Sequence, residues 1–394
     1  MRGSRRAAAA LLSLVAVVGL GRGAGVADAA PEGVVLTPID NPLVALPPAA
    51  GASLIRYPST SVTGEPITLT GSLLTPKKRP PAGGWPLAVW GHMTTGGADA
   101  CAPSTAAAGS SALTDMTSGD LIVSGLLKRG FAVVRPDYEG IGSPGPHPYL
   151  IGSSLARSMV DAAKGAVAAD PRIGRDVVVA GHSEGAVAAL FAAAEPARDW
   201  GDLRLRAAAA VTPPTRMGDI VDGVAEVPVK AGSATGELVG LAALLISGGK
   251  TVDRAFARTI DHGGLSVRAQ RLMPQVETRC YRDLSSERSF GALAPSELLG
   301  LRGTAAKAGL AAIARRNDVA GLQMPAGLPV RMDAGLVDEV APAPFVSGLA
   351  DLYRRRGTAV TFATHPAGHS TVPRAPQAAA EVSTWLARKV HSTG

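Results

Sequence analysis

The segment Asp176–Pro196, DVVVAGHSEGAVAALFAAAEP, constrains the fold of this chain more than any other. A run of β-branched residues predicts a buried strand over Val177–Ala180, and an alanine-rich run predicts a helix over Ala186–Ala194. The glycines of Gly-His-Ser-Glu-Gly between them allow the two arms of a sharp turn to approach closely, which strains and exposes Ser183. The segment therefore predicts a nucleophilic serine at a strand–turn–helix. The alternative is a glycine-rich turn whose serine caps the helix.

The helix after this turn bears on the chemistry of the serine. Unpaired N–H groups and the helix dipole favour negative charge at a helix N-terminus. The N–H of Glu184 is the expected donor to an oxyanion. Because 47 of 394 residues are glycine, a bare Gly-x-Ser-x-Gly is weak evidence, so this interpretation depends on the strand before it and the helix after it.

Short apolar runs alternate with longer helical patterns along the chain. This alternation predicts an α/β fold, a mostly parallel sheet covered by helices on both faces. An early pair of strands is expected to form an antiparallel edge. The predicted strands are Ser53–Tyr57, Pro66–Leu74, Leu87–Trp90, Phe131–Val134, Val177–Ala180, Ala207–Val211, Pro329–Met332 and Ala359–Ala363.

The alternation stops in the third quarter of the chain. We expect residues 30–215 and 327–394 to form the two parts of one core, with a helical cap inserted at 216–326. Glu237–Gly249 is the most apolar part of that insertion. The alternative is a run of ordinary core helices in a single larger domain.

The first 29 residues have the pattern of a secretory signal peptide. A basic MRGSRR precedes the apolar Ala7–Leu20, and Ala27-Asp28-Ala29 is a small-x-small cleavage site. Fourteen apolar residues are too few to span a bilayer comfortably, although a retained anchor is the alternative. We expect export by the Sec or the twin-arginine route and a secreted protein.

Charge and composition argue against several classes of partner. The formal net charge is +7, and removing residues 1–29, with four arginines and one aspartate, lowers it to +4. Aromatic residues make up only 4%, which is unfavourable for a nucleic-acid interface. The seven histidines do not cluster, so no metal is expected. Gly140–Gly145 matches a dinucleotide fingerprint, but nearby prolines block the helix it would need, so no cofactor is expected. The oligomeric state stays undetermined.

A nucleophilic serine needs a base, and the base needs an acid. His369 follows the last predicted strand and comes last in chain order, as the base does in serine hydrolases of this topology. His365 is the alternative base. Asp338 lies in a loop after a predicted strand and is the preferred acid, with Asp333 and Glu339 as alternatives.

The second oxyanion donor is expected in the loop Gly91–Ser104, which follows the strand Leu87–Trp90. Thr94 is the preferred donor N–H, with Met93 and Thr95 as neighbours. A simple glycine loop is the alternative.

The chain has two cysteines, Cys101 and Cys280. An even number in an exported protein favours a disulfide over two buried free thiols.

Several segments together resemble the secretory lipase family, the lipase-A-like group of α/β-hydrolases. Its oxyanion loop, its Asp-Tyr and His-Pro-Tyr-Leu segment, its serine turn, its acid loop and its histidine loop each have a counterpart. These are WGHMTTGGADACAPS (Trp90–Ser104), PDYEGIGSPGPHPYLIG (Pro136–Gly152), GHSEGAVAAL, GLVDEVAP and PAGHS. The chain departs from the family's pattern at Met93, Arg331 and Asp333.

The resemblance implies an α/β-hydrolase fold with a helical cap, acting on carboxylic esters. It implies a disulfide between Cys101 in the oxyanion loop and Cys280 in the cap. It also implies that Asp137, Tyr138 and the stretch 147–150 support the pocket rather than take part in the chemistry.

We therefore expect a secreted serine hydrolase that cleaves carboxylic esters through Ser183, His369 and Asp338 and an acyl-enzyme intermediate. The apolar cap helix favours a lipase acting on acylglycerols, with transient contact with a lipid interface. A short-chain carboxylesterase, an acyltransferase and a peptidase on the same scaffold are the alternatives. A non-catalytic binding protein is the alternative from a different class.

Overall fold

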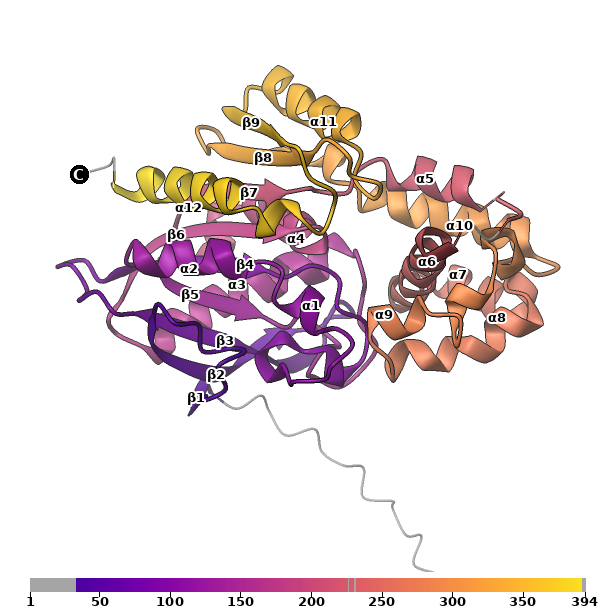
Figure 1. The fold of residues 1–394 in the computed structure, drawn as a ribbon, viewed down its shortest axis with the longest axis horizontal. Helices are drawn as coiled ribbons and strands as arrows, with labels where there is room; N and C mark the ends of the chain where they lie inside the picture. Colours follow the sequence, from indigo (N-terminus) through magenta and orange to yellow (C-terminus); the bar gives the residue numbers. More distant parts are fainter. Residues whose placement is uncertain (1–32, 226, 230–231, 392–394) are drawn as a thin grey trace, which may run out of the picture. The chain divides into compact units, whose positions relative to one another are not determined.

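The computed structural model describes residues 33–225, 227–229 and 232–391. A nine-stranded sheet in the order β1-β2-β3-β5-β4-β6-β7-β8-β9 forms its centre (Figure 1). The strands are β1 Val35–Pro38, β2 Ala49–Thr60, β3 Pro66–Pro76, β4 Trp85–Gly91, β5 Ala132–Pro136, β6 Ile173–His182, β7 Arg204–Val211, β8 Val330–Gly335 and β9 Val360–His365.

Strands β5-β4-β6-β7-β8-β9 run parallel, and β1, β2 and β3 form an antiparallel edge. The predicted antiparallel pair at the start of the chain is confirmed, and so is the mostly parallel sheet. All seven residues of β4 and all five of β5 are buried. Strands that are buried on both faces tend to have continuous apolar sequences. This explains why short apolar runs in the sequence predicted both strands.

Helices cover both faces of the sheet (Figure 1). Along β4, Leu87 and Val89 belong to one core cluster, and Ala88 and Trp90 belong to the other. The first cluster includes residues of α3 Gly152–Ala169, α4 Glu184–Ala194 and α11 Ala343–Arg355, and the second includes residues of α2 Asp120–Lys128 and α12 Pro376–His391. Alternate side chains of a strand point to opposite faces, so the sheet has one core on each side.

The described residues between β7 and β8 form helices and turns and no strand. Figure 1 shows these helices gathered beyond one end of the sheet. They are α5 Met217–Val224, α6 Gly232–Val252, α7 Arg254–Thr259, α8 Val267–Leu272, α9 Tyr281–Leu284 and α10 Gly303–Arg316. We call residues 216–326 the cap segment. Its limits as an inserted domain stay a prediction.

Sequence patterns did not identify every element. β1 is four residues long and exposed throughout, so it has no burial pattern to read. By contrast, α11 buries Val346, Leu349, Ala350 and Tyr353 at helical spacing, so its sequence does carry a helical pattern. In the part of the chain that the structure describes, no helix has both the length and the apolar character needed to cross a bilayer.

Candidate active site

Ser183 lies at a sharp turn between β6, which ends at His182, and α4, which begins at Glu184. Its φ of 56° and ψ of −118° lie where residues other than glycine are strained. A Cβ on Gly181 would lie 2.0 Å from the carbonyl oxygen of Gly185. A Cβ on Gly185 would lie 2.0 Å from the carbonyl oxygen of Gly91. The glycines on both sides of the serine are therefore sterically required, and the predicted strand–turn–helix is confirmed.

The histidine loop and the acid loop bring His369 and Asp338 to the same edge of the sheet as Ser183. His369 Nε2 lies 2.8 Å from Ser183 Oγ. His369 Nδ1 lies 2.9 and 3.1 Å from the two carboxylate oxygens of Asp338. A carboxylate only accepts, so it holds the proton on Nδ1 and leaves the Nε2 lone pair for the serine hydroxyl. The three side chains, each buried, form one hydrogen-bonded row.

Backbone donors hold the Asp338 carboxylate in place. Its Oδ1 accepts from the N–H groups of Val340, at 2.9 Å, and Ala341, at 2.6 Å. These two donors fix the orientation in which the carboxylate faces the ring of His369.

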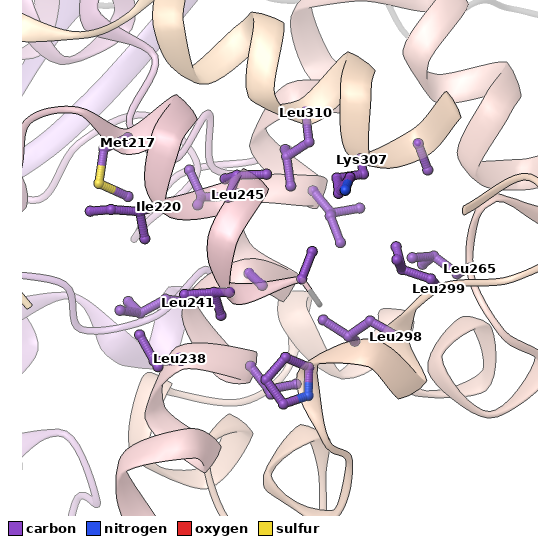
Figure 2. A pocket seen from close by; sticks show the side chains of 18 of the residues that line it. Met217, Ile220, Leu238, Leu241, Leu245, Leu265, Leu298, Leu299, Lys307 and Leu310 are labelled. Carbon is purple, nitrogen blue, oxygen red and sulfur yellow. The ribbon is translucent and has the colours of Figure 1, made fainter. Parts of the chain in front are cut away.

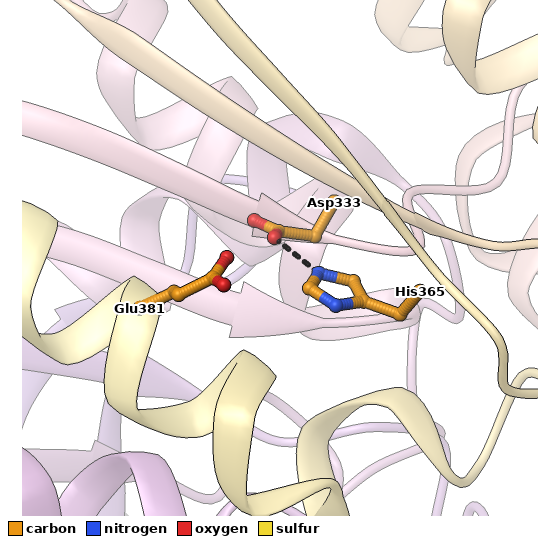
Figure 3. A group of neighbouring side chains, drawn as sticks. All are labelled: Asp333, His365 and Glu381. Carbon is orange, nitrogen blue, oxygen red and sulfur yellow. Dashed lines mark hydrogen bonds and ion pairs between the residues drawn. The ribbon is translucent and has the colours of Figure 1, made fainter.

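Asp333 and His365, the alternative acid and base, pair with each other instead. His365 Nε2 lies 2.8 Å from Asp333 Oδ1 (Figure 3). Arg331 donates to both oxygens of Asp333, at 2.8 and 2.7 Å, and to Glu381 at 3.1 Å. Asp333, His365 and Glu381 are close enough to share an ion. However, the positively charged guanidinium of Arg331 already contacts both carboxylates and would repel a second cation there, so this cluster fits a structural ion pair.

Met93 and Thr94 line the pocket that contains Ser183 and His369, whereas Thr95 does not. Among the described residues, the N–H groups of Glu184 and Thr94 have no acceptor within hydrogen-bond distance. Both N–H groups are therefore free to take the role of oxyanion donor, which stays a prediction. Met93 stays an alternative to Thr94 because it lines the same pocket.

A buried polar network supports the oxyanion loop. The hydroxyl of Tyr138 donates to the carbonyl of His92 at 3.0 Å. The Asp137 carboxylate accepts from the N–H and hydroxyl of Ser104, at 2.9 and 2.6 Å, and from the hydroxyl of Thr70 at 2.7 Å. Burial raises the pKa of Asp137, and the hydrogen bonds from Ser104 and Thr70 oppose that rise. These contacts fit the supporting role expected for Asp137 and Tyr138.

A disulfide joins Cys101 to Cys280, which are 179 residues apart. Beside it, the N–H of Tyr281 donates to the carbonyl of Thr95 at 2.8 Å. The oxyanion loop is thus attached to α9 of the cap segment by a covalent bond and a hydrogen bond. The expected disulfide agrees with the structure.

The pocket at Ser183 has a charged rim. Glu237 of α6, Arg282 of α9 and Glu339 of the acid loop line it. Arg282 donates to Asp115 at 2.6 Å. Burial raises the pKa of Glu237, and Arg282 opposes that rise. The pocket at Ser183 therefore has a mixed lining, in which these charged residues occur together with apolar ones such as Leu241 and Leu245.

The cap segment also contains an apolar cavity (Figure 2). Every side chain that lines it is apolar except Lys307. Met217, Leu241, Leu245 and Val340 line both the cavity and the pocket at Ser183. The two spaces are therefore neighbours, and the apolar cavity extends between α5, α6 and α10.

Two buried histidines near Ser183 make contacts that the sequence did not predict. His182 Nε2 lies 3.0 Å from the carbonyl oxygen of His369, and His147 Nε2 lies 2.8 Å from Glu184 Oε1. The His-Pro-Tyr-Leu resemblance pointed to His147 as a support, but no local pattern indicated its partner. No sequence signal placed His182 against the His369 loop.

The model of the secretory lipase family matches residues 107–393, well over half of the chain. The protein belongs to the secretory lipase family. A comparison with curated protein sequences finds no match. Together with the fold, family membership identifies the chain as a carboxylic ester hydrolase of the α/β-hydrolase type.

Solved structures share this fold. Candida antarctica lipase A is similar at a TM-score of 0.68 and 18% identity, covering 86% of this chain and 77% of that one. The rice cell wall degrading esterase LipA from Xanthomonas oryzae is similar at a TM-score of 0.66 and 19% identity, covering 86% and 88%. At these identities the likeness establishes the fold alone.

Proposed function

We propose that this secretory lipase family member is a secreted serine hydrolase that cleaves acylglycerol esters through Ser183, His369 and Asp338. Ser183 attacks the ester carbonyl while His369 takes its proton through Nε2, and the same proton passes to the leaving alcohol. Asp338 orients His369 and stabilises its charged form. The N–H groups of Glu184 and Thr94 bind the oxyanion. Water then attacks the acyl-enzyme, and the acid is released.

The observation that carries this proposal is the 2.8 Å contact between His369 Nε2 and Ser183 Oγ, with Asp338 on the other ring nitrogen. A fluorophosphonate probe tests it directly, because it reacts only with an activated serine. We expect labelling at Ser183, and we expect Ser183→Ala to abolish both labelling and turnover while the protein stays folded. An unlabelled wild-type protein without esterase activity would favour the non-catalytic alternative.

The apolar cavity supports a substrate with a long acyl chain. Leu241 and Leu245 lie where the cavity meets the pocket of Ser183, so a chain bound to the serine can continue between the cap helices. Each buried methylene contributes about 0.8 kcal/mol. Longer acyl chains should therefore bind more tightly until the cavity is filled. The charged rim at Glu237 and Arg282 leaves a polar region for the alcohol part of the ester.

A series of p-nitrophenyl esters tests the acyl site. We expect kcat/KM to rise from acetate to longer chains, and we expect Leu241→Trp to lower it at least tenfold for long chains while largely sparing the acetate. Leu301→Trp is the matched control because Leu301 is fully exposed. A wild-type rate that is highest for the acetate and falls with chain length would favour a short-chain carboxylesterase. Ester products with alcohol acceptors would indicate an acyltransferase.

Secretion is the remaining part of the proposal. The signal-peptide prediction falls on residues 1–29, which lie outside the described residues. The family description and the disulfide, a bond typical of oxidising compartments, support an extracellular location. The N-terminal sequence of the exported protein tests it. We expect a mature chain that starts at about residue 30.

A further inference from the structure

The residue after the nucleophile carries a fully buried carboxylate. The side chain of Glu184 has 0% of its surface exposed. Its own N–H, at the start of α4, is one of the proposed oxyanion donors. Negative charge develops on the substrate oxygen during acylation, so an uncompensated carboxylate behind this donor would oppose it. The site therefore needs a nearby positive charge or a proton.

His147 supplies that compensation. Its side chain is 1% exposed, and its Nε2 lies 2.8 Å from Glu184 Oε1. Its Nδ1 lies 2.7 Å from the carbonyl oxygen of Glu139. A carbonyl can only accept, so Nδ1 carries a proton, and a carboxylate at Nε2 calls for a second one. Glu184 and His147 together thus hold one extra proton and have no net charge.

The surroundings favour the extra proton. Burial lowers the pKa of His147, but the negative charge of Glu184 and the hydrogen bonds to Glu184 and Glu139 outweigh this effect and leave the pKa raised. The Glu139 carboxylate, which also favours the proton, accepts from the Val62 N–H and the Ser154 hydroxyl. The remaining titratable groups around the pair are His92, Tyr138 and Tyr149. All three are buried.

The loop that carries His147 also contacts the other proposed donor. The Tyr149 hydroxyl lies 2.8 Å from the Thr94 hydroxyl, and the rings of Tyr138 and His147 stack with their centroids 6.2 Å apart. One buried segment between β5 and α3 thus supports both sides of the oxyanion site. A change in the charge of His147 would therefore act close to the oxyanion site, where negative charge develops in the transition state.

We propose that His147 is a positioning residue whose positive charge neutralises the Glu184 carboxylate behind the oxyanion site, so that acylation depends on this buried ion pair. The inference rests on the proposed function, because it assumes that Ser183 forms an acyl-enzyme. His147 itself touches neither Ser183 nor His369 in this arrangement.

A double-mutant cycle separates charge compensation from a merely structural role. His147→Gln keeps a hydrogen-bond donor but removes the charge, and Glu184→Gln removes the carboxylate with little change in shape. At pH 8 we expect H147Q to lower kcat on the order of 10- to 100-fold, from the energy of one unit charge a few ångströms away. We expect E184Q to lower kcat by a smaller factor than H147Q does. The H147Q/E184Q double variant should recover most of the rate that H147Q loses.

The pH profile gives a second readout. Wild-type kcat should fall at alkaline pH as His147 loses its proton, and this limb should be absent in E184Q, where no buried carboxylate remains to be neutralised. All rates are expressed per serine labelled by the fluorophosphonate, so that unfolded molecules do not count.

Two results would overturn the inference. The first is a double variant whose kcat is as low as that of H147Q or lower. The second is an H147Q variant with the wild-type kcat. If H147Q does not fold, the comparison of E184Q with the wild type decides, and an E184Q profile that keeps the alkaline limb rejects the inference. Ser183→Ala reports separately on the proposed function. Activity in that variant would reject the serine mechanism itself.

Discussion

His182 Nε2 donates a hydrogen bond of 3.0 Å to the backbone carbonyl oxygen of His369, 187 residues further along the chain. On the other side of the ring, the Ser118 hydroxyl lies 3.1 Å from Nδ1. A carbonyl only accepts, so the proton of His182 is on Nε2, and Nδ1 accepts from Ser118. The residue before the proposed nucleophile thus holds the loop that carries the proposed base.

Replacing His182 should change the rate more than the binding of substrate. We expect His182→Leu to lower kcat up to about 100-fold with little change in KM, because an imidazole displaced by about 1 Å loses its alignment with Ser183. His182→Gln is the matched control, since its amide can still donate to the His369 carbonyl. Steady-state kinetics check both variants. If the His182→Gln variant is no more active than the His182→Leu variant, the hydrogen bond from residue 182 is not what holds the loop.

Asp338 and Asp333 should respond differently to the same substitution. We expect Asp338→Asn to lower kcat on the order of 10⁴-fold, because an amide can no longer stabilise a charged His369. Asp333→Asn removes one partner of a buried ion pair with Arg331 and should lower the free energy of unfolding by about 3–5 kcal/mol. Its kcat per labelled serine should stay within about tenfold of the wild type. Urea unfolding and kinetics measure the two effects, and the opposite pattern would make Asp333 the acid.

The disulfide should stabilise the protein and hold the oxyanion loop against the cap segment. Because Cys101 and Cys280 are 179 residues apart, removing the bond should lower the free energy of unfolding by about 2–5 kcal/mol. The measurement is urea unfolding with and without reducing agent. The C101A/C280A variant is the control and should be insensitive to the reductant. A wild-type protein equally stable in both conditions would contradict the prediction.

Stability should fall as the pH is lowered from 7.5 to 5.5. Burial lowers the pKa of His182 and His92 from the ordinary 6.5, so below this value the unfolded chain binds protons that the folded chain does not. The free energy of unfolding then decreases by up to about 1.4 kcal/mol per pH unit for each histidine. The raised pKa of His147 acts in the opposite sense. Its contribution to the free energy of unfolding is complete at low pH and is lost as the pH rises through the pKa of His147 in the folded protein.

Urea unfolding at several pH values measures this slope. His182→Gln removes one of the two histidines whose pKa is lowered, so the stability of this variant should depend less steeply on pH. A wild-type stability that is constant over the range, or that rises toward pH 5.5, would show that these histidines do not govern the response.

The sequence was informative wherever the physical cause is local. A strand that passes into a helix through a serine between glycines can adopt few backbone conformations. The strain predicted at Ser183 agrees with its φ of 56°. Strands buried on both faces, such as β4, are continuous apolar runs. Chain order indicated which loops follow parallel strands, and therefore that His369 and Asp338 lie at the same edge of the sheet as Ser183. Their catalytic roles stay predictions until the variants are measured.

The tertiary structure decided which polar groups meet. No spacing in the sequence pairs Glu184 with His147 or His182 with the carbonyl of His369, because these contacts join loops whose approach depends on how the sheet and helices pack. The same holds for Asp333, which pairs with Arg331 and His365 and not with Ser183. The sequence by itself determined the sheet, the strained serine and the loops that follow the strands, through local backbone and burial preferences. Only the packed structure decided the partner of each buried charge, because a buried charge must be neutralised by whatever group the fold brings beside it.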